Sequence, residues 1–218
     1  FVGIASPAGS VTLGRQYSSI YDVMGNYDPM DYADYGVLSH DLGMMARVDK
    51  ALKYTGKFDD VTVTGFYSFG RDKDMAPGEV PGDAKSGRQW GLGVNYDAGP
   101  FAFGVAYDSL NNPSPIDMMN GSVLADRKLN YNNSGSDKTA RRIAVGTSYT
   151  LGSVKFFLGY RNLKTDFSAQ TFVPPGMPVP PGIVPYLVNF DLGYKSNLYW
   201  GGVKWQATPE TILTAAVH

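Results

Sequence analysis

Apolar and polar residues alternate with a period of two along most of the chain, and helical periodicity is nearly absent. In residues 61–69, valine and aromatic side chains occupy one face and threonine and serine the other. In residues 101–107, the second face carries alanine and glycine, which are small rather than polar. The pattern predicts about ten strands, at residues 1–4, 11–15, 46–54, 61–69, 90–96, 101–107, 142–149, 154–161, 197–205 and 211–217.

The connections between these strands are alternately short and long. Tight polar turns are expected near residues 57–60, 97–100, 151–153 and 207–210, and long loops at 16–44, 71–88 and 109–140, with a proline-rich stretch at 174–185. Aromatic residues flank the short turns (Tyr54, Tyr96, Phe101, Tyr149) and also the long loops (Tyr67, Phe69, Trp90, Tyr107, Tyr160). Two aromatic belts and loops that are long at one end only are typical of a transmembrane antiparallel β-barrel.

A soluble β-sandwich or soluble barrel is the alternative, because its strands show the same alternation. It would need a dry core between apolar faces and gives no reason for long loops at one end alone. The pattern therefore favours the membrane barrel over the sandwich.

The amino-acid composition excludes several classes of function. The 218 residues suit one all-β domain, residues 1–218. The net charge of −1 without a basic stripe argues against nucleic acid as a partner. The chain has no cysteine and two histidines, so we expect no metal site, no cofactor and no histidine-rich catalytic centre. No run of 18 apolar residues is present, so we expect no transmembrane helix.

Residues 16–44 form a long segment rich in tyrosine, aspartate and glycine, with an arginine on each side, Arg15 before it and Arg47 after it. A loop of this length without a regular pattern is usually functional or disordered. Acids on a loop that face arginines on a wall are what an ion-filtering constriction needs.

Three stretches resemble the Gram-negative general porins, most closely the β-proteobacterial type. They are residues 11–17 (VTLGRQY), residues 47–54 (RVDKALKY), and residues 91–96 followed by Gly99-Pro100-Phe101. The likeness extends over essentially the whole chain. It implies a homotrimer of 16-stranded barrels in the outer membrane of a Gram-negative bacterium, in contact with lipid and lipopolysaccharide. It also implies passive diffusion of small hydrophilic solutes and ions past a third external loop, residues 16–44 here, that folds inward. About ten strands are covered, so we expect the sequence to be a piece that lacks strands at both ends.

The resemblance also assigns the constriction. Arg15 and Arg47 would be the wall arginines, and the loop acids would be Asp28, Asp31 and Asp34. Strict alternation places Arg15 on the lipid face with Val11 and Leu13, where an arginine costs about 2–4 kcal/mol at the membrane midplane. A β-bulge or a strand end at Gly14 would rotate it inward, and barrel rims favour such bulges, so we expect Arg15 to face the pore. Further charged residues fall on predicted inward positions and would line the pore: Asp49, Lys53, Lys155, Arg161 and Lys204. The positive strands predict a mild preference for anions.

Two other functions are open. In a substrate-specific porin, the tyrosines of residues 17–35 would form a stacking track for sugars or aromatic acids. An outer-membrane barrel enzyme would need His40, but Ser39, His40 and Asp41 are adjacent in sequence and do not converge as a catalytic triad does. The acids Asp72, Asp74 and Glu79 lack the spacing of a calcium loop and suit a solvated loop or a lipopolysaccharide contact.

Overall fold

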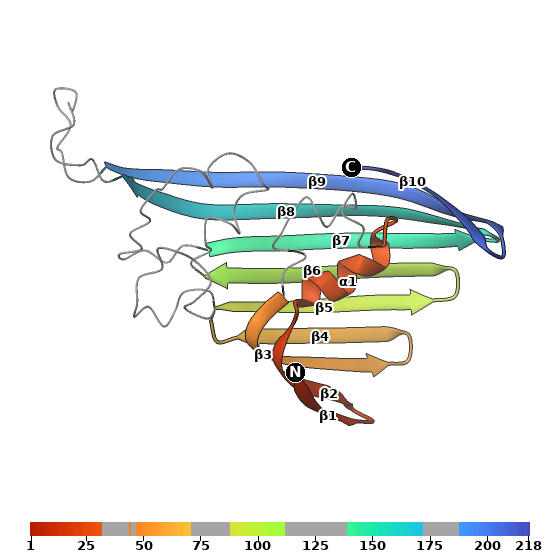
Figure 1. The fold of residues 1–218 in the computed structure, drawn as a ribbon, viewed down its shortest axis with the longest axis horizontal. Coiled ribbons are helices and arrows are strands. Elements are labelled where there is room, and N and C mark those ends of the chain that lie inside the picture. The colour runs from red at the N-terminus through yellow and green to blue at the C-terminus, as the bar shows by residue number, and fades with distance from the viewer. Residues whose placement is uncertain (32–43, 45–46, 71–87, 112–138, 172–187) are drawn as a thin grey trace.

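The computed structural model describes residues 1–31, 44, 47–70, 88–111, 139–171 and 188–218, and gives only the strand path for 165–171 and 188–194. Ten antiparallel strands form one sheet in the order of the sequence (Figure 1). The strands are β1 (Val2–Ser6), β2 (Gly9–Tyr17), β3 (Arg47–Phe58), β4 (Val61–Ser68), β5 (Gln89–Ala98), β6 (Phe101–Asn111), β7 (Thr139–Leu151), β8 (Val154–Thr171), β9 (Val188–Thr208) and β10 (Thr211–Val217). The predicted number and direction of the strands are confirmed.

Several strands are longer than the alternation predicted. Strand β8 continues to Thr171 and β9 begins at Val188, and the two stay paired up to the Thr171–Val188 register. The prediction ended the first strand at residue 161 and began the second at 197, because polar residues interrupt the apolar face there. Backbone pairing does not depend on that face, so the ladder extends past the apolar band.

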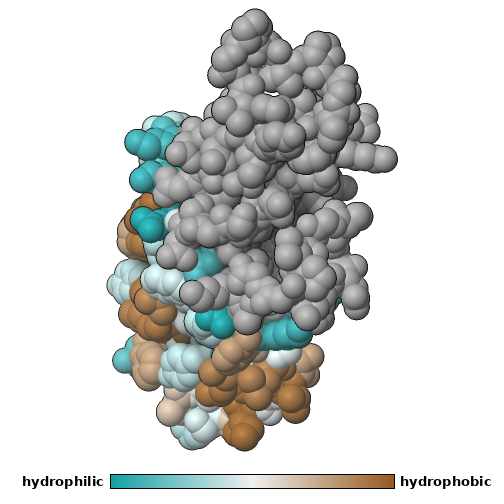
Figure 2. All heavy atoms as spheres, turned by 90° about the vertical axis from the view of Figure 1, so that its left-hand side faces the viewer, coloured by the Kyte–Doolittle hydropathy of each residue, from teal (hydrophilic) through white to brown (hydrophobic). Residues whose placement is uncertain are grey.

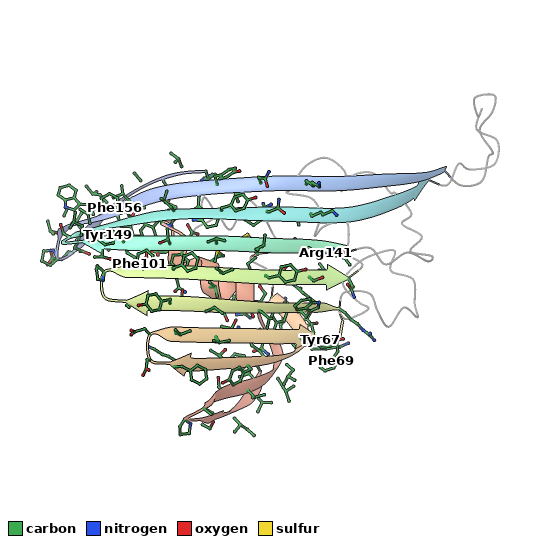
Figure 3. The ribbon with its side chains drawn as sticks, turned by 180° about the vertical axis from the view of Figure 1, so that it is seen from behind. Tyr67, Phe69, Phe101, Arg141, Tyr149 and Phe156 are labelled. Carbon is green, nitrogen blue, oxygen red and sulfur yellow. The ribbon has the colours of Figure 1, made fainter. Side chains whose placement is uncertain are left out.

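The outer face of the sheet is apolar and exposed. Leu92, Val94 and Leu158 alternate with small or polar residues and point away from the inner face. Aromatic side chains stand at both ends of this face: Phe101, Tyr149 and Phe156 beside the tight turns, and Tyr67 and Phe69 at the opposite end (Figure 3). Figure 2 shows the hydrophobic residues along the left-hand edge and at the bottom of the molecule. The predicted belts are therefore present on the outside.

The inner face carries a short helical segment. Helix α1 (Ser19–Met24) and the 3-10 turn η1 (Gly25–Tyr27) follow β2 and lie in front of β5, β6 and β7 (Figure 1). The main buried cluster lies between this segment and the sheet and contains Ile20, Val23, Met24, Tyr27, Met44, Ala102, Ala106, Ala144 and Trp200. Among the described residues, no helix has the length and apolarity needed to cross a membrane.

Candidate functional site

Residues 18–31, called the inner segment below, are shaped by local polar contacts. Ser18 caps α1 through its hydroxyl, which accepts a hydrogen bond from the Tyr21 amide at 3.3 Å. At the far end, the Asp28 carboxylate accepts a hydrogen bond from the Met30 amide at 2.9 Å. These contacts build one helical turn and then stop it, so the chain can run across several strands.

Tyr27 fixes the inner segment against the sheet. Asn95, Gly104, Gly146, Gly159 and Trp200 form one register row across β5, β6, β7, β8 and β9. The Tyr27 hydroxyl donates a hydrogen bond to the Asn95 side chain, and the Trp200 indole donates one to the Tyr27 carbonyl at 2.8 Å. A Cβ at Gly104 or Gly146 would lie 2.5 Å from the Tyr27 ring. Only glycine leaves room for the ring at these two positions.

Three further contacts hold the rest of the segment. A Cβ at Gly93 would lie 2.7 Å from Val23, and one at Gly202 would lie 2.6 Å from Pro29. Asp31 forms an ion pair with Lys204 of β9. The inner segment is therefore in contact with the sheet from β5 to β9. Burial on this side raises the pKa of Tyr27 above its ordinary value, which keeps the phenol protonated.

The other side of the inner segment borders an open, charged pocket of about 510 Å³. Phe1, strands β2 and β3 and helix α1 supply its lining, which includes three cations, Arg15, Arg47 and Lys53, and one acid, Asp22. Neutral polar groups from the inner face complete the lining, among them Thr12, Gln16 and Thr55. The pocket, called the cationic pocket below, therefore has an excess of positive charge.

Arg15 lines this pocket and lies beside a β-bulge. The β2–β3 register shifts between Gly14 and Gln16, and Gly14 has φ 122°. Gly14 and Gln16 pair with Ala51 and Val48, so the extra residue of the bulge lies in β3, where Lys50 has φ 48°. A bulge is present at the expected place, but its extra residue is not in β2, and the inward rotation of Arg15 stays a prediction. The Arg15 side chain then pairs with Asp49 at 3.2 Å while more than half of it stays exposed.

Lys53 joins the wall to the inner segment. Its ammonium group forms an ion pair with Asp22 of α1 and donates a hydrogen bond to the Tyr17 carbonyl at 3.0 Å. Burial raises the pKa of the Asp22 carboxyl, and the nearby Lys53 ammonium opposes part of that rise. Asp22 is therefore an acid of the pocket that protonates more readily than an exposed aspartate.

Arg47 lies over an aromatic pair at the edge of the pocket. Its guanidinium carbon is 4.9 Å from the centre of the Tyr17 ring, and Tyr17 stacks on Tyr21 with ring centres 3.8 Å apart. Burial is the main cause of a raised pKa for the Tyr21 phenol. The Arg47 charge faces a neutral ring, whereas the Arg15 charge faces a carboxylate.

The structure brings together some of the predicted constriction residues and separates others. Arg15 and Arg47 line the same pocket, but Asp28 is buried and Asp31 contacts Lys204, so neither acid lies beside the arginines. Asp34 lies outside the described residues, as do His40 and the acids Asp72, Asp74 and Glu79. The roles of all three loop acids in ion passage stay predictions.

Four of the five predicted pore-lining residues lie on the inner face. Lys53 lines the cationic pocket, and Lys155 and Lys204 lie over the Phe157 ring at 5.3 and 5.6 Å. The fifth, Asp49, pairs with Arg15. Arg161 is buried and donates a hydrogen bond to the Ser196 carbonyl at 3.3 Å. A position on the inner face does not by itself mean that a residue contacts passing ions, so that role stays a prediction for these residues.

The sequence did not indicate that Asp22 lines the pocket and pairs with Lys53, or that Tyr27 is buried. The signal for Asp22 was its place four residues after Ser18, inside a capped turn on the pocket side. Tyr27 was counted in the aromatic track, but it is fully buried and cannot stack on a solute. Among the described residues, no group of three potential ligands could hold a metal ion.

Comparison with known proteins adds independent findings. A sequence model of the Gram-negative porins matches residues 1–218, whereas the curated proteins gave no match. Three solved structures share the fold: the anion-selective porin of Comamonas acidovorans (TM-score 0.67, 16% identity), outer-membrane expressed OmpT of Vibrio cholerae (0.62, 17%) and Salmonella typhi OmpF in complex with daunomycin (0.51, 17%). The matches cover 98%, 98% and 94% of this chain and 54%, 56% and 58% of theirs, respectively. The chain therefore spans about half the length of these proteins, and the predicted porin-type barrel fold is confirmed.

Proposed function

Because this chain belongs to the family of Gram-negative porins, we propose that it builds part of a water-filled channel for the passive diffusion of small hydrophilic solutes and ions. Membership of this family places the protein in the outer membrane of a Gram-negative bacterium. We assign it no enzymatic activity. The homotrimer implied by the family resemblance is part of the proposal.

The cationic pocket is the observation that carries the proposal. Its lining has three cations against one acid, and Asp22 is itself paired with Lys53. The inner segment is in contact with the sheet from β5 to β9 and leaves the side toward β2 and β3 open. In the full protein this arrangement would narrow the pore to the space beside Arg15 and Arg47, which supports residues 16–44 as the constriction loop.

We infer a preference for anions from the same lining. Fixed positive charge raises the local concentration of anions and lowers that of cations. Two unit charges about 4 Å apart in water interact by about 1 kcal/mol, which corresponds to about a fivefold change in local concentration. The effect falls with distance and salt, so the preference is modest.

A planar bilayer with the full-length protein and a salt gradient across it tests this proposal. We expect steady ohmic conductance in triplet steps and a reversal potential with the sign of an anion-preferring pore. Silence from correctly folded protein would exclude the channel, and the opposite sign would exclude the anion preference while leaving the channel in place.

A second candidate, a substrate-specific porin, receives support from one contact. The stacked pair of Tyr17 and Tyr21 with Arg47 beside it would suit a planar solute that carries a carboxylate. Such a solute would block the conductance saturably, and a Tyr17→Leu variant would lose the block. A conductance that aromatic acids leave unchanged would favour the general diffusion channel.

A further inference from the structure

We propose that Lys155 and Lys204 form a binding site for a small dianion such as inorganic phosphate, and that the Asp31 carboxylate competes with the solute for this site. Lys155 of β8 and Lys204 of β9 are in register on the inner face, so their Cα atoms lie about 4.5–5.5 Å apart. We call these two residues the lysine pair. The inference rests on the proposed channel, because a solute reaches the inner face only from a water-filled interior.

The lysine pair lies at the tight-turn end of the sheet. Lys155 is the second residue of β8 and directly precedes Phe156, which Figure 3 shows at that end. Lys204 is in register with Thr214, close to the turn between β9 and β10. Barrels of this type have their short turns on the periplasmic side. The lysine pair therefore faces the periplasmic mouth, whereas the cationic pocket is lined mainly from β2 and β3.

One aromatic ring supports both ammonium groups of the lysine pair. The Nζ atoms of Lys155 and Lys204 lie 5.3 and 5.6 Å from the centre of the Phe157 ring. Phe157 is itself buried, so its ring excludes water from one side of the site. An anion is attracted more strongly where less water surrounds the charges. Lysine stems are flexible, so both ammonium groups can turn toward one ligand.

The lysine pair has one acid for two cations. Like charges directly opposite each other on neighbouring strands destabilise a sheet. Asp31 forms an ion pair with Lys204, and within the described part of the chain Lys155 forms none. One positive charge therefore has no counter-charge from the protein. A dianion would neutralise both ammonium groups through charge-assisted hydrogen bonds, whereas chloride brings a single charge.

Asp31 is placed so that a solute can displace it. It is the last residue of the inner segment, and its amide donates a hydrogen bond to the Asp28 carbonyl at 3.2 Å. The Asp31 side chain is 74% exposed, whereas that of Lys204 is 18% exposed. The carboxylate can therefore turn into water without losing a buried contact, while the lysine stays in place. Asp31 would cover the site when no solute is bound.

Lysine acetylation of the full-length protein in detergent tests this inference without requiring ion flow. The acyl donor reacts with the neutral amine, so a bound anion that favours the ammonium form slows the reaction. Mass spectrometry of peptides would give the rate at each lysine as phosphate is added, with chloride at the same ionic strength as the reference. We expect phosphate to slow acetylation of Lys155 by about fivefold relative to chloride. Lys57, an exposed lysine near the turn after β3, is the internal control and should react equally in both salts.

Removing the competing carboxylate should strengthen phosphate binding. In Asp31→Asn, we expect the phosphate concentration that half-protects Lys155 to fall by about fivefold. Asp60→Asn removes one acid from the turn after β3 and should leave that concentration unchanged. Lys204→Gln leaves a single ammonium group at the site, so the protection of Lys155 should be lost.

Equal protection of Lys155 by phosphate and chloride, or protection that survives Lys204→Gln, would overturn the binding site. Equal effects of Asp31→Asn and Asp60→Asn would overturn the competition by Asp31. Bilayer recording of the same protein separates these results from a failure of the channel proposal. Conductance without phosphate protection would overturn the site and leave the channel in place, whereas protection without conductance would do the reverse.

Discussion

The two sides of the inner segment differ in almost every physical property. Toward β5–β9 it packs against glycines and alanines, the hydrogen bond from Trp200 is buried, and Tyr27 has no exposed surface. Toward β2 and β3 it borders an open pocket with three cations. The first side supplies most of the packing, and the second presents charge to the pore and is joined to the wall by the Lys53–Asp22 ion pair. The comparison teaches that the position of the charged groups depends largely on packing contacts on the opposite side.

Filling the space under Tyr27 should have the largest effect on stability and conductance. A Gly146→Ala variant places a Cβ 2.5 Å from the Tyr27 ring, so the ring has to move. We expect a loss of about 1–3 kcal/mol in the free energy of unfolding and a larger, noisier conductance, because the segment leaves its position. Thermal unfolding and single-channel recording would measure both.

Gly201→Ala is the matched control for that substitution. Its Cβ lies on the outer face and comes no closer than 3.2 Å, to the flexible end of Leu158. We expect wild-type conductance. If the two alanine variants behave alike, the glycine at 146 is not needed to hold the inner segment.

Removing one buried hydrogen bond should have the next largest effect. A Trp200→Phe variant keeps an aromatic ring but leaves the Tyr27 carbonyl without its indole donor. An unsatisfied buried acceptor costs about 1–3 kcal/mol, and the cavity left by the smaller ring adds to the cost. We expect a lower melting temperature with unchanged ion preference. A change in reversal potential without a change in melting temperature would contradict the division between the two sides.

The two arginines of the cationic pocket should differ in their effect on ion preference. Arg15 is paired with Asp49, whereas Arg47 contacts the neutral ring of Tyr17. We expect Arg47→Gln to lower the anion-to-cation permeability ratio by about two- to fivefold and Arg15→Gln to lower it less. Lys57→Gln, at the opposite end of β3, is the control with the same charge change. An equal effect of all three would show that only net charge matters.

Acid should increase the anion preference slightly, and Asp22 should be one cause. Burial raises the pKa of Asp22, so this carboxylate gains a proton at a higher pH than exposed aspartates do when the pH falls. Loss of its negative charge leaves the pocket more positive. We expect the reversal potential of wild type to shift with acid more than that of Asp22→Asn. Asp60→Asn, at the turn after β3, should behave as wild type does.

The strands were predictable from the sequence because each needs only local alternation and a turn at its end. A bulge near Gly14 was also predictable, since an arginine on the lipid face would have been costly, but the sequence did not indicate that its extra residue lies in β3. Helix α1 was not predictable, because six residues are too few for helical periodicity and a helix this short depends on tertiary packing. Its residues lie within the segment for which the sequence predicts an irregular loop.

Which charged residues pair in the candidate site depends on how the inner segment packs against the sheet. The sequence offers several aspartates between Arg15 and Arg47, and spacing alone does not say which of them turns toward the wall. The packing of Val23 and Tyr27 decides it by placing Asp22 beside Lys53 and Asp31 beside Lys204. In the sequence, the glycines that permit this packing appear only as small residues. Nothing in the sequence indicates that the Tyr27 ring lies over them.

The most direct test of the central claim is a disulfide across the packed side of the inner segment. The chain has no cysteine, so a pair can be introduced without competing thiols. In Pro29→Cys/Gly202→Cys the two Cβ atoms start about 2.7 Å apart, close enough that a small shift reaches the 3.5–4.5 Å of a disulfide. Pro29→Cys/Gly201→Cys is the control, because residue 201 points to the outer face. We predict that oxidation links only the first pair and that the linked channel keeps its conductance and ion preference. Equal linking of both pairs, or no linking of the first, would contradict the placement of the inner segment inside the barrel.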